Sequence, residues 1–274
     1  MNTDIVSVPW RGYRELRAAG WSRTQIDGAV ATGTLVRVRR GRYLPPDAPP
    51  VVVEAVRHGG RLDCISLLAH LGVFVFDSQT LHVQFDRGAS RLPPRSSSVA
   101  HWRRSSAGEA DTATGLREAL AQACRCQSPR HAVATLDSAW HRGFVDEVDV
   151  ADVFARLPAP FGVVRKHLDP RAEAGTESLV RLMLRGLGGD VRVQVDIATV
   201  GRVDLVVGDW LIVECDSREF HGGPAEQQRD RQRDLAAAAL GYTTLRLLAE
   251  DILYRPERVL AALRGILSSR STAA

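Results

Sequence analysis

The chain has 274 residues, of which 45% are hydrophobic and 25% are charged, as in a soluble globular protein with two or three small domains. Its apolar runs stay well short of the 18 residues of a membrane-spanning helix, and its start lacks the charged-then-apolar pattern of a signal peptide. These features argue against a membrane or exported protein. We therefore expect a cytoplasmic protein with no membrane partner.

Positive charge is concentrated near the N-terminus. The formal net charge of the whole chain is +4, whereas residues 1–46 carry eight arginines against three acids, which gives +5 (8 − 3). The rest of the chain is therefore close to neutral. A basic segment of this kind predicts a module that binds phosphate groups.

Residues 10–44 predict two short helices followed by two strands. Ser22 and Gln25 have the spacing of a capping box, which predicts the start of the second helix at this point. Residues 35–38 then alternate like a strand, and the basic turn 39–41 leads into a returning strand. This order predicts a small winged helix-turn-helix domain over residues 1–46.

We expect the second helix to enter the DNA major groove and the wing to contact the DNA backbone. Arg23, Thr24 and Asp27 are placed to reach bases, while the arginines mainly contact phosphate. The predicted DNA-binding residues are Arg23, Thr24, Arg37, Arg39, Arg40 and Arg42. The alternative is a basic helix–hairpin that only packs against the rest of the chain.

The middle of the chain, residues 51–168, predicts a mixed α+β domain after a proline-rich linker at 45–50. The expected elements are helices at 51–57 and 64–72, strands at 80–85 and 99–102, and two or three helices within 115–157. The remainder of 86–114 predicts exposed loops.

The ionisable and thiol groups of this region predict packing rather than chemistry. His131, Asp137 and His141 lie among apolar residues at helical spacing, with no nucleophile nearby in sequence. Cys124 and Cys126 likewise indicate packing on a helix. The four cysteines show neither a CxxC pair nor a His/Cys spacing suited to zinc, so we expect reduced thiols without that metal.

The C-terminal region, residues 173–274, predicts a mixed sheet with helices on both faces. The expected elements are a helix at 177–187, strands at 191–197, 202–207 and 211–216, a glycine-rich loop at 217–224, a helix at 225–240, a strand at 243–248 and a helix at 256–267. Their order is αβββαβα, so the whole chain is predicted to be an α/β multidomain protein.

Three carboxylates lie at the ends of two of these strands. A Gly208-Asp209 turn joins the strands as a hairpin. Asp204 is near the start of the first strand, while Glu214 and Asp216 end the second and point to the same face. Such carboxylates repel one another without a cation, whereas Mg²⁺ prefers hard oxygen ligands.

The C-terminal pattern resembles the PD-(D/E)XK nuclease superfamily, with its restriction-endonuclease-like fold. Within this superfamily it is most similar to Vsr-like endonuclease domains, which are related to very-short-patch mismatch repair. The likeness covers about residues 173–267. It is carried by Val203-Asp204, Val213-Glu214-Cys215-Asp216-Ser217, Phe220-His221, Arg229-Asp230, Arg233-Asp234, Gly241-Tyr242 and Arg246.

The resemblance implies metal-dependent hydrolysis of a DNA phosphodiester. Asp204 and Glu214, with the backbone carbonyl of Cys215, would hold Mg²⁺ or Mn²⁺. Glu177, in the first turn of its helix, would reach the metal directly or through water.

Proton transfer would fall to Asp216 or His221. The residues implied to orient this pair are Asp230, Arg233 and Asp234. The chain departs from the family pattern at two positions. Asp216 stands where the superfamily usually has lysine, and the Vsr-like relatives also lack that lysine. Ser217 stands where those relatives usually have glycine.

The N-terminal runs 20–26 and 33–43 resemble the winged helix of AbiEi-type antitoxins, which regulate transcription in toxin–antitoxin and phage-defence operons. The segments 65–72 and 82–85 are compatible with the domain that follows this winged helix in such proteins. This resemblance implies DNA and a toxin as partners.

Three hypotheses remain open at this point. The first is a DNA endonuclease or nickase acting in repair or phage defence. The second is an AbiEi-like regulator with an inactive nuclease fold, and the third is a scaffold that acts within a repair or defence complex. Target sequence and oligomeric state do not follow from the pattern.

Overall fold

The structure of the chain is a computed structural model that describes residues 8–90, 92, 98–216 and 224–271. It divides into two compact units. The N-terminal unit comprises Met1–Ser128 and Val145–Phe161, and the C-terminal unit comprises Pro129–Phe144 and Gly162–Ala274. Among the described residues, no helix is long and apolar enough to cross a membrane.

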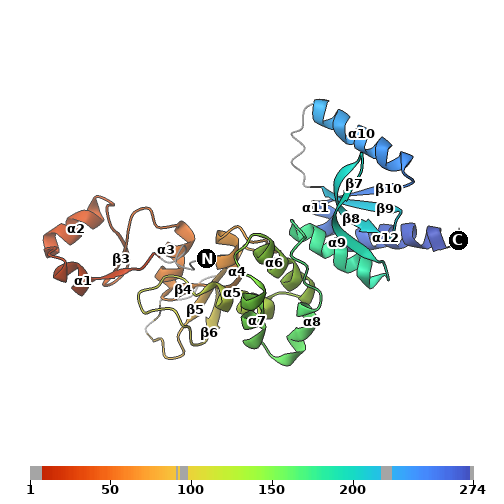
Figure 1. Ribbon diagram of the computed structural model, residues 1–274. Coiled ribbons are helices and arrows are strands. Elements are labelled where there is room, and N and C mark those ends of the chain that lie inside the picture. The colour runs from red at the N-terminus through yellow and green to blue at the C-terminus, as the bar shows by residue number, and fades with distance from the viewer. Residues whose placement is uncertain (1–7, 91, 93–97, 217–223, 272–274) are drawn as a thin grey trace. The chain divides into compact units, whose positions relative to one another are not determined.

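The N-terminal unit begins with a helix–hairpin segment, residues 11–44 (Figure 1). Its elements are β1 (Arg11–Gly12), α1 (Tyr13–Ala18), α2 (Arg23–Ala31), β2 (Val36–Arg39) and β3 (Arg42–Leu44), with the strands in the order β1-β3-β2. The predicted order of helices and hairpin strands is present, and β1 is an addition to it. Both hydrogen bonds of the capping box form: Gln25 N donates to Ser22 Oγ at 3.1 Å and Ser22 N donates to Gln25 Oε1 at 2.7 Å.

A small core holds this segment together. Leu16, Ile26 and Tyr43 are buried, and Trp21 and Val30 pack against them. Each helix therefore contributes one buried apolar residue, Leu16 or Ile26, to a core that the hairpin closes with Tyr43. This arrangement exposes the polar face of α2 to solvent.

The rest of the N-terminal unit is a three-stranded sheet with helices. Its elements are α3 (Pro50–His58), β4 (Arg61–Leu62), α4 (Cys64–His70), β5 (Leu81–Phe85), β6 (Ser98–Trp102), α5 (Leu116–Cys126) and α7 (Glu147–Ala155), followed by a 3₁₀ turn at Ala159–Phe161. The strand order is β4-β5-β6; β4 and β5 are antiparallel, whereas β5 and β6 are parallel.

Two expectations for this region are wrong. Residues 86–114 are not exposed loops throughout, because Thr112 and Thr114 are buried and hydrogen bond to the backbone of Leu62 on both sides of a parallel bridge. The linker at 45–50 also ends earlier than predicted. Pro50 is already the first residue of α3, a position where the missing N–H of proline costs no hydrogen bond.

The C-terminal unit contains a four-stranded mixed sheet with strand order β10-β9-β8-β7. Its elements are α6 (Pro129–His141), α8 (Gly162–Arg165), α9 (Gly175–Gly186), β7 (Val191–Ile197), β8 (Gly201–Val207), β9 (Leu211–Asp216), α10 (Pro224–Ala239), β10 (Thr243–Leu248), α11 (Ala249–Tyr254) and α12 (Pro256–Ser271). Apart from α11, the elements from α9 onward are those predicted. Helices α9 and α10 flank the sheet on opposite sides (Figure 1).

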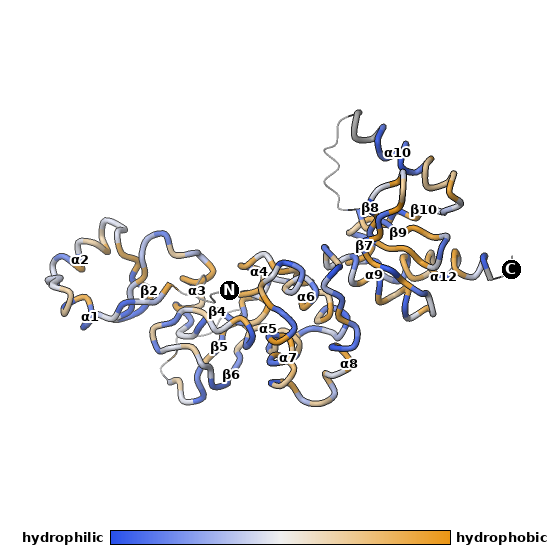
Figure 2. The backbone as a smooth tube through the Cα atoms, in the orientation of Figure 1, coloured by the Kyte–Doolittle hydropathy of each residue, from blue (hydrophilic) through white to orange (hydrophobic). Residues whose placement is uncertain are grey.

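The central strands β8 and β9 contribute much of the hydrophobic core of this unit, and they are orange along much of their length in Figure 2. Leu205, Val206 and Val213 on these strands are completely buried, and Ala237 of α10 packs on the same sheet. Burial on both faces explains why these strands read as nearly continuous apolar runs. The polar residues at their ends therefore stand out.

Helix α6 groups with the C-terminal unit through a buried ion pair. Asp137 accepts hydrogen bonds from Arg181 Nη2 at 2.6 Å and Ser178 Oγ at 2.7 Å, both on α9. Burial raises the pKa of Asp137 to about 6, against the opposing influence of Arg181. These contacts join α6 to α9, so the two compact units divide the chain differently from the three domains predicted from sequence.

Candidate functional site

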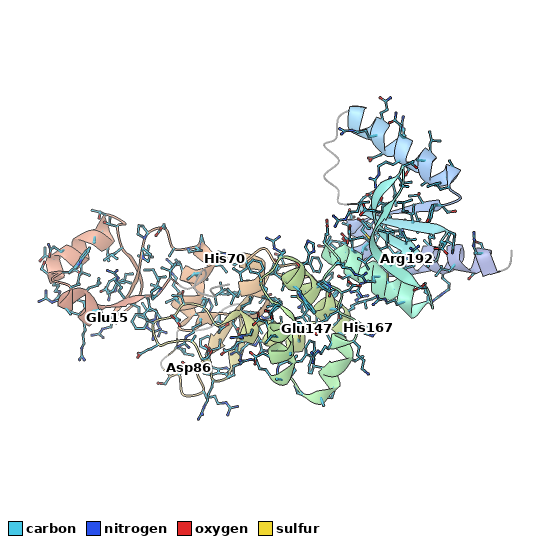
Figure 3. The ribbon with its side chains drawn as sticks, in the orientation of Figure 1. Glu15, His70, Asp86, Glu147, His167 and Arg192 are labelled. Atoms are coloured by element: carbon cyan, nitrogen blue, oxygen red, sulfur yellow. The ribbon has the colours of Figure 1, made fainter. Side chains whose placement is uncertain are left out.

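The β8–β9 hairpin positions the first two acids of the site. Gly208, with φ +54°, begins the turn, and Leu205 pairs with Val213 in the antiparallel ladder. Arg192, labelled in Figure 3, donates to the carbonyl of Gly208 at 2.9 Å and thereby anchors the turn to β7. With this register, the acids at positions 204 and 214 lie side by side at the far end of the hairpin.

Backbone N–H groups hold these two carboxylates. Asp204 Oδ2 accepts from Cys215 N at 2.8 Å, and Glu214 Oε2 accepts from Asp204 N at 3.3 Å. Glu214 is only 7% exposed. The hairpin alone therefore brings two acids together, as the sequence predicted.

The third acid, Glu177, comes from α9. It is 4% exposed and accepts hydrogen bonds from the backbone N–H groups of Glu173 and Ala174 at the start of that helix. Gln194 Nε2 donates to Glu177 Oε2 at 2.9 Å and reaches Asp204 Oδ1 at 3.5 Å. The structure thus brings Glu177 to the hairpin acids, with Gln194 as a bridge.

Sequence reasoning missed Gln194. Its side-chain carbonyl accepts from Arg202 Nε at 2.6 Å, and Arg202 also pairs with Glu173. Gln194 has φ +52°, a left-handed conformation that is unfavourable for a residue with a side chain and that concentrates at functional sites. A glutamine within a strand carries no sequence signal for this role.

Burial and mutual repulsion determine the electrostatics of the site. Burial, followed by repulsion from Asp204, raises the pKa of Glu214 to about 7. Burial also raises the pKa of Glu177 to about 7, with Asp204 and Glu214 adding to the effect and Gln194 opposing it. The site therefore stabilises protonated carboxyls near neutral pH, and a cation would reverse that preference.

Arginines from α10 and β10 contact the edge of the acidic site. Arg233 Nη2 donates to Glu214 Oε1 at 3.3 Å. Arg246 lies 3.6 Å from Asp216 Oδ1 through Nη1 and donates to Asp234 Oδ1 at 2.8 Å through Nη2. Asp234 therefore acts on Asp216 through a shared arginine, whereas Arg233 contacts Glu214 directly.

Asp216 is only partly buried, and burial raises its pKa while Arg246 opposes the change. Asp230 of α10 adds electrostatic repulsion to Asp216. His221 and Ser217 lie outside the described residues. The predicted orientation of His221 by the α10 side chains therefore stays a prediction.

The arginines of the helix–hairpin segment fall into two groups. Arg23, Arg37 and Arg40 are exposed, as is Thr24, and Arg23 lies 3.7 Å from Asp27. Arg42 is half-buried over the Trp10 ring, 4.5 Å from its centroid, and burial lowers its pKa.

Arg39 is the second half-buried arginine. It lies so close to Gly59 that a Cβ there would meet its guanidinium. Together with Trp10 and Arg61, these two arginines line a cavity of about 590 Å³ within the N-terminal unit. Arg39 and Arg42 are therefore less exposed than Arg37 and Arg40, and their predicted contact with phosphate stays a prediction.

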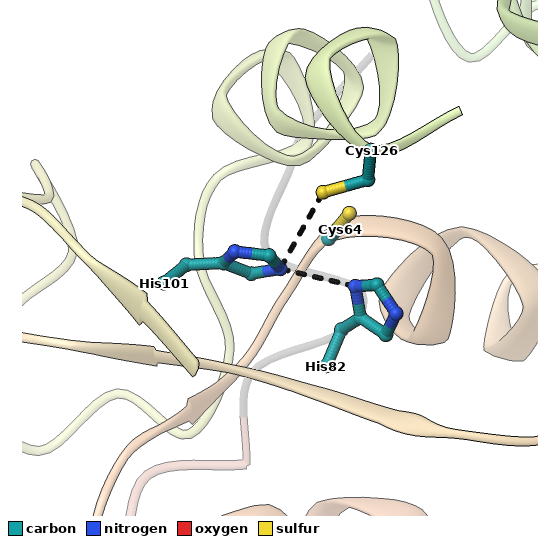
Figure 4. Close-up of side chains that lie close together, drawn as sticks. All are labelled: Cys64, His82, His101 and Cys126. Atoms are coloured by element: carbon teal, nitrogen blue, oxygen red, sulfur yellow. Dashed lines mark hydrogen bonds between the residues drawn. The ribbon is translucent and has the colours of Figure 1, made fainter. Parts of the chain in front are cut away.

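A second cluster of ionisable groups was not expected. Cys64, His82, His101 and Cys126 gather in the N-terminal unit, with candidate ligand atoms all within 4.8 Å of one another (Figure 4). Among the described residues, this is the one group whose ligand atoms converge on a single point in this way. Cys126, interpreted from the sequence as a packing residue, is instead exposed and lies in this cluster, whereas Cys124 is buried as expected.

Comparison with known proteins adds relatives but no family. No family model matches the chain. Two uncharacterized proteins of Mycobacterium tuberculosis, from strains CDC 1551 / Oshkosh and ATCC 25618 / H37Rv, are each 28% identical over 260 residues. The matched region covers 88% of this chain and 95% of each relative. The likeness therefore extends over both compact units.

Proposed function

We propose that the protein is a metal-dependent DNA endonuclease or nickase whose active site is the acidic cluster of the C-terminal unit. The observation that carries the proposal is the proximity of Glu177, Asp204 and Glu214, which come from α9, β8 and β9 and are linked by Gln194 and backbone N–H groups. Three partly or fully buried carboxylates in mutual repulsion form an unfavourable arrangement unless a cation neutralises them.

The donor set fits a hard divalent cation. Asp204 and Glu214, with the backbone carbonyl of Cys215, would hold Mg²⁺ or Mn²⁺, and carboxylate and carbonyl oxygens are the ligands that Mg²⁺ prefers. When bound, the ion supplies Lewis-acid polarisation of the phosphate and lowers the pKa of a water. Glu177 is the remaining acid within reach of this set.

Neighbouring side chains orient these acids. Gln194 spans Glu177 and Asp204, so it fixes the spacing between the helix and the hairpin. Arg246 lies between Asp216 and Asp234 and is placed to hold Asp216 at the rim of the site. Asp216 is then placed to accept a proton, because its side chain is 20% exposed whereas Glu177 and Glu214 are buried.

DNA as the substrate is supported by the helix–hairpin segment. Arg23, Arg37 and Arg40 are exposed within residues 1–46, which carry a formal charge of +5, and they can contact phosphate there. Thr24 is exposed at the start of α2, on the face that would meet base edges. A phosphodiester backbone is the polyanion that suits both this surface and the acidic site.

A plasmid-nicking assay tests the proposal. Purified protein is incubated with supercoiled DNA and Mg²⁺ or Mn²⁺, beside the variants Asp204→Ala and Glu214→Ala. Asp209→Ala is the matched control, because this acid lies on the same hairpin with its side chain 95% exposed. We expect at least a 100-fold loss in the two site variants, since the metal contributes several kcal/mol to transition-state stabilisation.

Equal rates in the wild type and both site variants, or no cleavage of duplex, mismatched or single-stranded DNA, would overturn the nuclease proposal. A regulator with an inactive nuclease fold is the second candidate. It is favoured by Arg233, which already compensates the charge of Glu214. A gel shift on the DNA upstream of its own gene, with retained binding and absent cleavage, is the result expected of this second candidate.

A further inference from the structure

We propose that the N-terminal unit contains a structural site for a zinc-class transition metal ion, distinct from the acidic site. Its four ligands are Cys64, His82, His101 and Cys126. The proposal is independent of nuclease activity, because none of these residues belongs to the C-terminal unit.

The distances match a tetrahedral site. His82 Nδ1 lies 3.0 Å from His101 Nε2, and Cys126 Sγ lies 3.9 Å from the same nitrogen (Figure 4). A zinc ion with ordinary Zn–N and Zn–S bonds separates two nitrogens by about 3.3 Å and two sulfurs by about 3.8 Å. These two separations are therefore within a few tenths of an ångström of tetrahedral values, and the other ligand atoms, all within 4.8 Å of one another, need to approach by about 1 Å at most.

Strand pairing brings the two histidines together. In the parallel ladder His82 pairs with Val99, and His101 pairs with Gln84. Residues two apart share a face of a sheet, so His82 and His101 lie diagonally on one face of adjacent strands. The two imidazoles project to the same point because of this register.

Two helix ends supply the cysteines above that face. Cys64 is the first residue of α4, and Cys126 is the last residue of α5, and these two helices pack against each other. Cys64 has φ +55°, an unfavourable backbone conformation for a residue with a side chain. Such a conformation persists where another interaction compensates for it, and a metal–sulfur bond is one.

The donor chemistry selects the class of ion. Two thiolates and two imidazoles suit Zn²⁺, with Co²⁺ as its spectroscopic substitute, and do not suit Mg²⁺ or Ca²⁺. Four protein ligands fill a tetrahedral ion completely and leave no position for substrate or water. The geometry therefore points to a structural rather than a catalytic ion.

The ion would stabilise a buried polar network beside it. Asp63, next to Cys64, is fully buried and accepts two hydrogen bonds from Arg103 Nη2, at 2.7 and 2.8 Å. Arg103 follows His101 by two residues and also binds Glu118 of α5 at 2.7 Å. Metal binding would thus hold α4, α5 and β6 in the positions that this network requires.

Metal analysis of the full-length protein tests the site. Protein purified without chelators or histidine tags is assayed for zinc, stripped, and titrated with Co²⁺ alone. We expect about one zinc ion per chain. We also expect the intense visible bands of tetrahedral Co²⁺ with sulfur-to-cobalt charge transfer, which a hydrogen-bonded histidine pair cannot produce.

The variants Cys126→Ser and His101→Asn should each lose zinc and the Co²⁺ bands. Cys124→Ser is the matched control, because it removes a buried thiol from the same helix and should retain both. Because Cys126 is exposed, its substitution is the one that the fold should tolerate best. The Co²⁺ spectrum of the wild type tests the site even if a variant fails to fold.

Three results would overturn the proposal. One is a wild-type protein that takes up neither zinc nor tetrahedral Co²⁺ after reduction. Another is a Cys64–Cys126 disulfide in protein kept under reducing conditions, shown by intact mass and peptide mapping. The third is equal metal content in the wild type, Cys126→Ser and Cys124→Ser.

Discussion

The two compact units each bring ionisable side chains close together, but with different chemistry and different spacing. In the C-terminal unit three carboxylates approach one another, held by backbone N–H groups, Gln194 and Arg233. In the N-terminal unit two thiols and two imidazoles converge, and none of these groups needs to be charged in the absence of a metal. The acidic site is destabilised by its own charge, whereas the thiol–imidazole site is not.

The two sites therefore differ in what would favour metal binding: charge repulsion at the acidic site, and the arrangement of the ligand atoms at the thiol–imidazole site. The acids favour a cation electrostatically but depend on hydrogen bonds to hold their present positions. The thiol and imidazole groups already lie within 4.8 Å of one another, although no charge among them requires a cation. A hard ion that can leave suits turnover, and a tightly held soft ion suits structure.

The largest expected effect is on the thiol–imidazole side of this comparison. Stripping zinc should lower the melting temperature of the N-terminal unit by about 10 °C or more, since a structural zinc site contributes several kcal/mol. Hydrogen exchange of residues 61–126 against residues 201–216 distinguishes the units. Adding Mg²⁺ to the stripped protein should not restore the protection of 61–126, and restoration by Mg²⁺ would contradict the assignment of a soft-metal site.

A smaller effect is expected on the acidic side. The pKa values of Glu177 and Glu214 are raised to about 7, so the folded state binds protons that the unfolded state has released above pH 4.5. Without divalent ions, the stability of the C-terminal unit should therefore fall between about pH 4.5 and 7, by on the order of 1–3 kcal/mol, and then level off.

Urea denaturation at pH 5 and pH 8 measures this change. The variants Glu177→Gln and Glu214→Gln should each reduce the pH dependence of the free energy of unfolding. The pKa of Asp137 is also raised, so the pH dependence that Asp137 causes should remain in both variants. Mg²⁺ should stabilise the wild type more at pH 8 than at pH 5. A pH dependence identical in the wild type and both variants would show that these acids titrate normally.

Loss of the glutamine bridge should have a milder consequence. Gln194→Ala removes the donor shared by Glu177 and Asp204, a change worth about 1 kcal/mol, or roughly a five- to tenfold loss of cleavage rate. Gln194→Glu, by contrast, adds a fourth carboxylate and should raise the Mg²⁺ concentration required for cleavage. If both variants cleave DNA at the wild-type rate, Gln194 has no role in the active site.

The smallest effect concerns DNA affinity. Arg37→Ala and Arg40→Ala should each reduce the slope of log affinity against log salt by about one, because each removes one phosphate contact. Arg264→Ala, an exposed arginine on α12 of the C-terminal unit, is the control. If all three variants share the wild-type slope in filter binding, the helix–hairpin segment does not contact DNA.

Local patterns predicted much of the architecture because they depend on near neighbours. The capping box at Ser22, the apolar alternation of β7 to β9 and the turn at Gly208 are all governed by residues a few positions apart. The pairing of Asp204 with Glu214 was predictable for the same reason, since a hairpin fixes its own register. Glu177 was predicted from its resemblance to a family pattern rather than from geometry.

Tertiary structure alone decided the rest. Gln194 bridges Glu177 and Asp204 only because α9 packs against the sheet, and Arg39 and Arg42 are half-buried only because they lie against Gly59 and Trp10. The residues of the thiol–imidazole cluster are at positions 64, 82, 101 and 126, so no short sequence motif predicts the cluster. The sequence by itself determined most of the helices and strands and the pairing of the hairpin acids. The second site depends on the parallel register of β5 and β6 and on the packing of two helix ends. Parallel strands pair residues that are far apart in the chain, so this site could not be predicted from local patterns.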